Sequence, residues 1–217
     1  MKGKNTEMDS RISNRQLATF YIVRHGQTEW NKNGLMLSFT DIPLNSNGEL
    51  QAKELAKKLK CIHYDAVISS DMSRARQTAE IIALERKLMV KTYEALRERS
   101  FGKFEGNNRK EYLKLLKDFA HLSDEEKFKH TGGGLMESLD QATSRFLILL
   151  REVAVAFAGK TVLVVSHGSV MRGLLIRLGF DTLKNLPSGC VLNTAYIKLE
   201  SDGVDFFIKE TYGINKD

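Results

Sequence analysis

Residues 161–168 have the sequence TVLVVSHG, a run of β-branched and apolar residues that ends in a polar turn. A short continuous apolar run of this kind is typical of a strand buried on both faces. A helical pattern follows Gly168. The same layout of strand and polar turn occurs at residues 21–26 and 67–74. Because strands alternate with helices, the sequence predicts an α/β fold with a largely parallel sheet.

The remaining elements follow the same alternation. Further strands are predicted at residues 20–23, 66–69, 88–90, 191–199 and 204–210. One helix is expected after Ser46-Asn47-Gly48-Glu49, which has the S-x-x-E form of a capping box. Two others are predicted at residues 71–84 and 137–157, because their apolar residues recur at helical spacing. We therefore expect a three-layer α/β/α sandwich.

The pattern changes between residues 97 and 139, where glycines interrupt the chain and a charged helical stretch covers residues 110–118. We interpret this segment as a helical cap subdomain inserted into a single catalytic domain, residues 20–217. Residues 1–19 have no apolar stretch of the kind a secretion signal needs, and we expect them to form a flexible tail.

Composition narrows the class of protein. The 217 residues are 42% hydrophobic and 28% charged, which is ordinary for a globular chain, and no apolar run approaches the length of a membrane helix. Two cysteines argue against a disulfide scaffold and favour the cytoplasm. The net charge of +6 indicates an anionic ligand, but the basic residues are spread along the chain, so nucleic-acid binding is not expected. The oligomeric state is left open.

Polar side chains follow three predicted strands at the point where each strand ends. Arg24 and His25 follow the first, Arg74 lies early in the helix after the second, and His167 follows the third. In an open α/β sheet, ligands bind beyond the carboxyl ends of the strands, so these side chains should meet at one rim. Arginine matches phosphate oxygens, and a neutral imidazole can attack phosphorus to form a covalent intermediate. The set therefore predicts phosphoryl transfer through a phosphohistidine.

A leaving group would also need a proton, and Glu98 is the candidate general acid. A carboxyl beside a dianionic phosphate is expected to hold its proton, which suits that role. Glu94 and Glu105 are neighbouring carboxylates that we interpret as solvated.

The chain resembles the histidine phosphatase superfamily, which includes the cofactor-dependent phosphoglycerate mutases. The resemblance covers roughly residues 20–212 in the family's order. The residues that carry it are Arg24-His25-Gly26, Thr28, Asn31, Asp41-Ile42-Pro43-Leu44, Gly48, Ser69-Ser70, Arg74, Thr78, Glu98-Arg99, Gly102, Gly106, Glu137-Ser138 and Ser166-His167-Gly168.

The resemblance implies a role for each matching residue. His25 would take the phosphoryl group, with Glu98 as acid and base, and no metal or other cofactor is implied. Arg24, Arg74 and His167 would hold the transferred group, while Asn31 and the Gly168 amide would add hydrogen bonds. We also assign Gln27, Thr28, Arg99, Arg109 and Ser169 to substrate binding.

Phosphatases and mutases of this family would share the phosphohistidine and differ in what accepts the phosphoryl group. The resemblance to mutases weakens after Glu98-Arg99, where this chain is shorter, and at Gln27, where they commonly have glutamate. We therefore expect hydrolysis of a small phosphorylated metabolite. The alternatives are a cofactor-dependent phosphoglycerate mutase, a phosphoprotein phosphatase, and a non-catalytic scaffold, which would be expected to lack His25 or Glu98.

Overall fold

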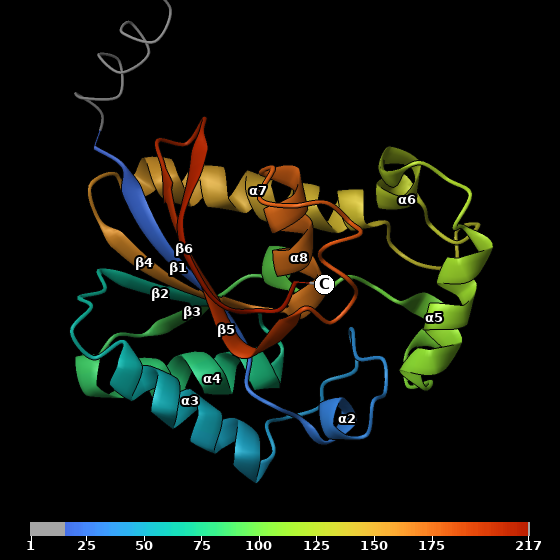
Figure 1. Cartoon of the computed structure of the whole chain (residues 1–217). Helices are drawn as coiled ribbons and strands as arrows, with labels where there is room; N and C mark the ends of the chain where they lie inside the picture. Colours follow the sequence, from blue (N-terminus) through green and yellow to red (C-terminus); the bar gives the residue numbers. More distant parts are fainter. Residues whose placement is uncertain (1–15, 217) are drawn as a thin grey trace, which may run out of the picture.

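The computed structural model describes residues 16–216 and contains a six-stranded sheet (Figure 1). Its strands are β1 (Ala18–Arg24), β2 (Ala66–Ser69), β3 (Val90–Thr92), β4 (Thr161–Ser166), β5 (Val191–Ser201) and β6 (Phe206–Ile214). Their order across the sheet is β3-β2-β4-β1-β5-β6. The first four of these strands are parallel, whereas β5 pairs antiparallel with β1 and β6 pairs antiparallel with β5. The expected α/β fold with a largely parallel sheet is confirmed.

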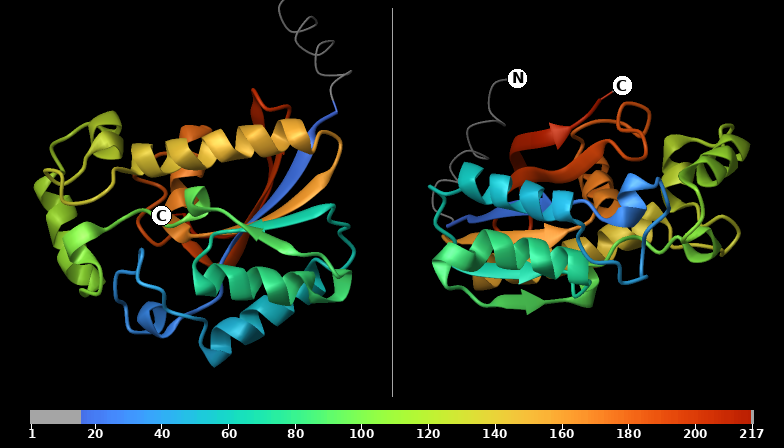
Figure 2. Two further views of the ribbon diagram at one scale, coloured as in Figure 1. Left: turned by 180° about the vertical axis from the view of Figure 1, so that it is seen from behind. Right: turned by 90° about the horizontal axis from the view of Figure 1, so that it is seen from below.

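Four helices cover the two faces of the sheet, as Figure 2 shows from behind and from below. The helices α3 (Ser46–Lys58) and α4 (Ser73–Ala83) lie on one face, and α7 (Leu139–Ala156) and α8 (Gly168–Arg177) on the other. The side chains of β1 alternate between these layers. Phe20 and Ile22 pack with the α7 and α8 residues, whereas Tyr21 and Val23 pack with those of α3 and α4. This period of two explains why the central strands are apolar throughout.

The segment predicted as a cap extends beyond the carboxyl ends of the parallel strands (Figure 1). It contains the short 3-10 turn η3 (Gly102–Phe104) and the helices α5 (Arg109–Asp118) and α6 (Asp124–Lys129). Backbone hydrogen bonds tie it to the loop after α2 (Glu29–Lys32), from Met36 to Asn107 and from Arg109 to Gly34. Further 3-10 turns are η1 (Leu84–Arg86) and η2 (Glu94–Leu96).

Several boundaries differ from the sequence-based expectation. The capping box at Ser46 is wrong, because Asn45 is the N-cap of α3 and its side chain accepts from the Gly48 amide. The strand expected at residues 88–90 is β3, shifted to Val90–Thr92 by its pairing with β2. The tail expected at residues 1–19 lies outside the described residues as far as residue 15, and β1 already begins at Ala18. No helix between residues 16 and 216 is long and apolar enough to cross a membrane.

Candidate active site

The candidate catalytic residues gather at the carboxyl ends of β1, β2 and β4. Arg24 pairs with Ser166 at the end of the β1–β4 ladder, and the His25 amide donates to the Ser166 carbonyl at 3.0 Å. His167 follows as the N-cap of α8, and Arg74 lies in the first turn of α4, directly after β2. The parallel strands therefore bring these four side chains to one rim, as the sequence predicts.

The ring of His25 is almost completely buried and held in one tautomer. Its Nδ1 lies 2.7 Å from the Gly26 carbonyl oxygen. A carbonyl oxygen can only accept, so Nδ1 carries the proton, and Nε2 of the neutral ring keeps its lone pair. The ring lies 5.1 Å from that of His167, centroid to centroid, at an interplanar angle of 63°. His25 thus has the orientation and tautomer of a nucleophile.

The electrostatic environment keeps both imidazoles neutral. Burial, followed by the positive charges of Arg74 and Arg24, holds the pKa of His25 well below its usual value. Burial and Arg74 lower the pKa of His167 in the same way. Burial also lowers the pKa of Arg74, to about 10, which leaves its guanidinium charged at neutral pH. The rim therefore combines fixed cations with neutral imidazoles.

Backbone carbonyls hold the two arginines in place. Nη1 of Arg24 donates to the Val191 carbonyl at 2.6 Å, and the two Nη atoms of Arg74 donate to Ser38 and Thr40. Within residues 16–216, Nε of each arginine and both ring nitrogens of His167 are buried without a hydrogen-bond partner. Because buried polar atoms are usually paired, these groups suit an anionic ligand with several acceptor oxygens.

Glu98 faces the same rim from the segment between β3 and α5. Its carboxylate accepts from the Arg99 amide at 2.8 Å, the Ser169 amide at 3.0 Å and the Val170 amide at 3.3 Å. The last two amides belong to the first turn of α8, where N–H groups have no partner within the helix. These contacts fix the position of the carboxylate within the site.

A cavity of about 200 Å³ opens above His25 and brings together most of the predicted residues. The predicted residues that line it are Arg24, His25, Asn31, Glu98, Arg109, Gly168 and Ser169. Arg74 and His167 do not line it but lie fully buried, and their charge and ring act directly on His25.

Three predicted substrate-binding residues point elsewhere. The Gln27 side-chain oxygen accepts from Nδ2 of Asn45 and Nδ2 of Asn47. Thr28 is buried and caps α2 by accepting from the Asn31 amide. Arg99 donates to the Tyr112 hydroxyl and lines a neighbouring pocket. The structure does not bring these three side chains to the cavity above His25.

Two segments that the sequence did not single out also line the cavity. Asn193 donates through Nδ2 to the His25 carbonyl at 3.0 Å and to Oδ1 of Asn31 at 3.3 Å. Ser188 and Gly189 lie under the Arg109 guanidinium, which donates to the Ser188 carbonyl. No motif surrounds these residues, and only the antiparallel pairing of β5 with β1 places Asn193 beside His25.

The turn that carries His25 requires a glycine at residue 48. A Cβ at Gly48 would lie 2.1 Å from the Gln27 carbonyl oxygen, and one at Gly26 would lie 2.4 Å from the Gly48 carbonyl oxygen. Overpacking of this kind typically costs 1–3 kcal/mol, and we expect Gly48→Ala to lower the free energy of unfolding by about 2 kcal/mol. Urea denaturation measures it. Leu50→Ala, on the exposed side of the same helix, should change it far less, and equal losses would contradict the close contact.

The lowered pKa values of His25 and His167 predict an acid-sensitive fold. Below about pH 6.5 these histidines are protonated in the unfolded chain but not in the folded chain. The free energy of unfolding therefore decreases as the pH is lowered. Each imidazole contributes up to about 1.4 kcal/mol per pH unit between its unfolded and folded pKa values. Urea denaturation at pH 7.5 and 5.5 gives the loss in the free energy of unfolding between the two pH values. This loss should be smaller for His25→Asn than for the unmodified protein, and His63→Asn, at an exposed histidine, should leave it unchanged.

Comparisons with known proteins identify the family of this chain. The model of the histidine phosphatase superfamily (branch 1) matches residues 20–212. The uncharacterized phosphatase PhoE of Bacillus subtilis (strain 168) is 33% identical over 195 residues, which cover 89% of this chain and 93% of that protein. A metal-independent phosphoserine phosphatase of Arabidopsis thaliana is 33% identical over 168 residues, 75% of this chain and 69% of that one. A solved phosphoglycerate mutase from Bacillus anthracis str. Sterne has a TM-score of 0.77 at 26% identity, covering 94% of this chain and 96% of its own.

Proposed function

Because this chain belongs to the histidine phosphatase superfamily (branch 1), we propose that it hydrolyses a small phosphomonoester through a phosphohistidine on His25. The observation that carries the proposal is the tautomer of His25. Its Nδ1 is engaged by the Gly26 carbonyl, so the unprotonated Nε2 is the atom available to attack phosphorus.

In the first step, the Nε2 lone pair of His25 forms a bond to phosphorus while the bond from phosphorus to the leaving oxygen breaks. Glu98 donates a proton to that oxygen, so the leaving group departs as a neutral alcohol. In the second step, water attacks phosphorus, Glu98 recovers a proton from it, and the P–N bond breaks. Inorganic phosphate leaves, and His25 is again neutral.

Charge stabilisation comes from the groups around His25. Arg24 and Arg74 are cations whose buried Nε atoms have no partner in the described part of the chain. They would neutralise the equatorial oxygens of the transferring group, where most catalysis of phosphoryl transfer lies. The site supplies this charge from its own side chains, and we propose that it works without a metal ion. A relative is named a metal-independent phosphatase, which supports that proposal.

A cofactor-dependent phosphoglycerate mutase is the second candidate. Arg109 favours it, since it adds a cation to the cavity beyond the pair beside His25, and a mutase must hold a second anionic group. The solved phosphoglycerate mutase from Bacillus anthracis is also similar in structure. Hydrolysis needs only water as acceptor, which a cavity open to solvent admits.

A panel of phosphorylated metabolites decides between the two. Phosphoserine, sugar phosphates and 3-phosphoglycerate with a trace of 2,3-bisphosphoglycerate would be incubated with the enzyme, and products followed by phosphorus NMR. We expect free phosphate from at least one metabolite, at a rate that excess EDTA does not change. Formation of 2-phosphoglycerate without free phosphate would overturn the phosphatase proposal, and inhibition by EDTA would contradict metal independence.

A further inference from the structure

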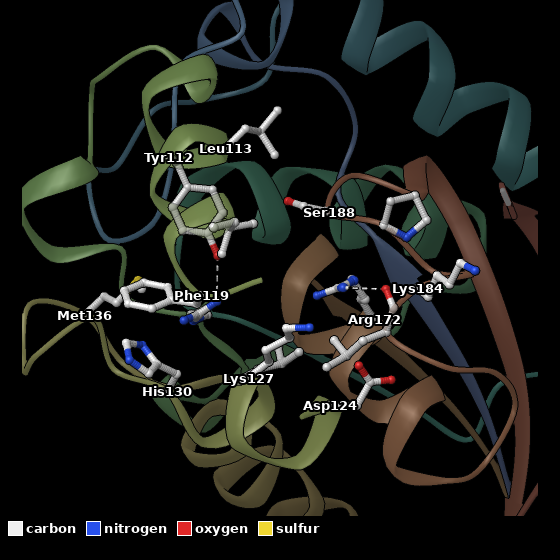
Figure 3. A pocket seen from close by; sticks show the side chains of 15 residues that line it. Tyr112, Leu113, Phe119, Asp124, Lys127, His130, Met136, Arg172, Lys184 and Ser188 are labelled. Carbon is white, nitrogen blue, oxygen red and sulfur yellow. Dashed lines mark hydrogen bonds between the residues drawn. The ribbon is translucent and has the colours of Figure 1, made fainter. Parts of the chain in front are cut away.

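A second pocket, of about 380 Å³, lies between the cap and the loop that precedes β5 (Figure 3). Its volume is within the range of small-molecule sites. Figure 3 shows Tyr112, Phe119 and Met136 on one side, with Arg172 and Lys184 on the other. Leucines of α5 and of the loop before β5 complete an apolar lining. The pocket thus offers an apolar surface beside a group of cations.

The charges that face this pocket are mostly positive. They are Arg99, Lys127, Arg172 and Lys184, against the single carboxylate of Asp124. Arg99 is only 6% exposed, and Arg172 is largely covered. Among residues 16–216, neither arginine has an ion pair with a carboxylate. A buried charge is costly unless it is paired, so this arrangement favours an anionic ligand.

Backbone and hydroxyl oxygens orient the two guanidinium groups. Arg99 donates through Nε to the Glu137 carbonyl and through Nη1 to the Tyr112 hydroxyl. Arg172 donates through Nε to the Leu186 carbonyl at 2.5 Å and through Nη2 to the Leu183 carbonyl. One terminal nitrogen of each, Nη2 of Arg99 and Nη1 of Arg172, has no hydrogen bond within the described residues. The arginines are held in place and keep donors for a ligand.

A wall of side chains separates this pocket from the cavity above His25. Phe101 lines that cavity and Tyr112 lines the pocket, and their rings pack edge to face with centroids 5.4 Å apart. Ser188 borders both spaces, and Arg109, which lines the cavity, donates to the Ser188 carbonyl. Apart from Ser188, the two linings have no residue in common, and the pocket uses none of the residues that we propose to act on the phosphoryl group.

We propose that this pocket is a second binding site, for a small amphipathic anion. Its ligand has an apolar body of aromatic size, which packs against Phe119, Met136 and the leucines. It carries one carboxylate, sulfonate or phosphate group, which accepts hydrogen bonds from Arg99 and Arg172. The site does not depend on phosphatase activity, because its walls and its cations are separate from His25.

The probe for a test is 8-anilinonaphthalene-1-sulfonate, an aromatic sulfonate whose fluorescence rises in apolar sites. Its neutral counterpart is N-phenyl-1-naphthylamine, which has the same rings without the charge. We expect the sulfonate to bind with a stoichiometry of one and the neutral amine to bind about tenfold more weakly, as loss of a charge-assisted hydrogen bond predicts. Equal affinities would overturn the proposal.

Substitutions locate the site. Leu113→Trp places a larger side chain at a partly exposed position in the lining and should abolish sulfonate binding. Leu135→Trp, at an equally exposed leucine of the cap outside the pocket, should leave it unchanged. Arg172→Met should weaken binding about tenfold or more. Should that variant fail to fold, Lys127→Met supplies the charge test, with Lys129→Met on the same helix but outside the pocket as its control.

Competition separates this site from the catalytic cavity. Sulfonate affinity should be the same in His25→Ala as in the unmodified protein, and filling the site should leave the KM for 4-nitrophenyl phosphate unchanged. Competitive inhibition would overturn the proposal, because the pocket would then be part of the substrate site. The fluorescence measurements do not require turnover. A failure of the proposed phosphatase activity would therefore be distinguishable from a failure of this binding proposal.

Discussion

The variant His25→Ala is expected to lose hydrolysis of 4-nitrophenyl phosphate by about 10⁴-fold or more, the usual result of removing a covalent nucleophile. The ring of His25 is buried, oriented by the Gly26 carbonyl and kept neutral by burial and two arginines. No other imidazole in the described chain combines these features with a position on the cavity wall. Initial rates with the two proteins measure the loss.

The matched control is His63→Ala, which removes an exposed imidazole outside the cavity and should keep full activity. Circular dichroism would establish that both variants are folded. A second measurement identifies the intermediate: brief mixing with a substrate labelled at phosphorus should leave label on the unmodified protein but not on His25→Ala. That label should survive alkali and be lost in acid, as a phosphoramidate does. Retained turnover in the variant would refute the mechanism.

The rim of the site was predictable because its residues lie directly after apolar strands. Arg24, His25 and His167 each follow a strand that the sequence marks clearly, and parallel pairing then requires that they meet. The hydrophobic pattern fixes which residues form the strands, and topology fixes where the strands end. Chemistry located at strand ends is therefore readable from one sequence.

Side-chain direction was not predictable in the same way. Gln27 and Thr28 directly follow Arg24-His25-Gly26, yet their side chains serve the local turn, one with Asn45 and the other as a helix cap. A position next to a site residue in the sequence does not determine where a side chain points, because polar side chains also bond to nearby backbone groups. For the same reason, the N-cap of α3 is Asn45 and not the predicted Ser46.

Long-range pairing decided the other differences. The edge strand β3 begins at Val90 because Val67 of β2 sets its register, and the apolar Met89 is left almost fully exposed. Asn193 reaches the His25 carbonyl only because β5 returns antiparallel to β1. Neither contact has a local sequence signal, since each depends on residues far away in the chain.

The role proposed for Glu98 predicts that Glu98→Gln affects substrates according to their leaving group. An alkyl phosphate needs a proton at its leaving oxygen, so its hydrolysis should slow by about 10²- to 10⁴-fold. A 4-nitrophenolate ion departs without a proton, so phosphorylation of His25 by 4-nitrophenyl phosphate should remain fast. Attack of water on the phosphohistidine also needs Glu98, so the second step should become limiting for 4-nitrophenyl phosphate, whereas the first step stays limiting for the alkyl phosphate.

Rapid mixing of Glu98→Gln with 4-nitrophenyl phosphate should therefore release one equivalent of nitrophenolate in a burst, followed by slow turnover. The alkyl phosphate should give no burst. The amides of Arg99 and Ser169 donate to different oxygens of Glu98, and glutamine keeps only one oxygen, so one of these amides would face an NH₂ group. An unpaired buried group costs about 1–3 kcal/mol, so urea denaturation must accompany the kinetics.

Glu94→Gln, at an exposed carboxylate nearby, is the control. Equal slowing of both substrates without a burst would remove Glu98 from the proton-transfer role, because only a proton donor distinguishes the two leaving groups.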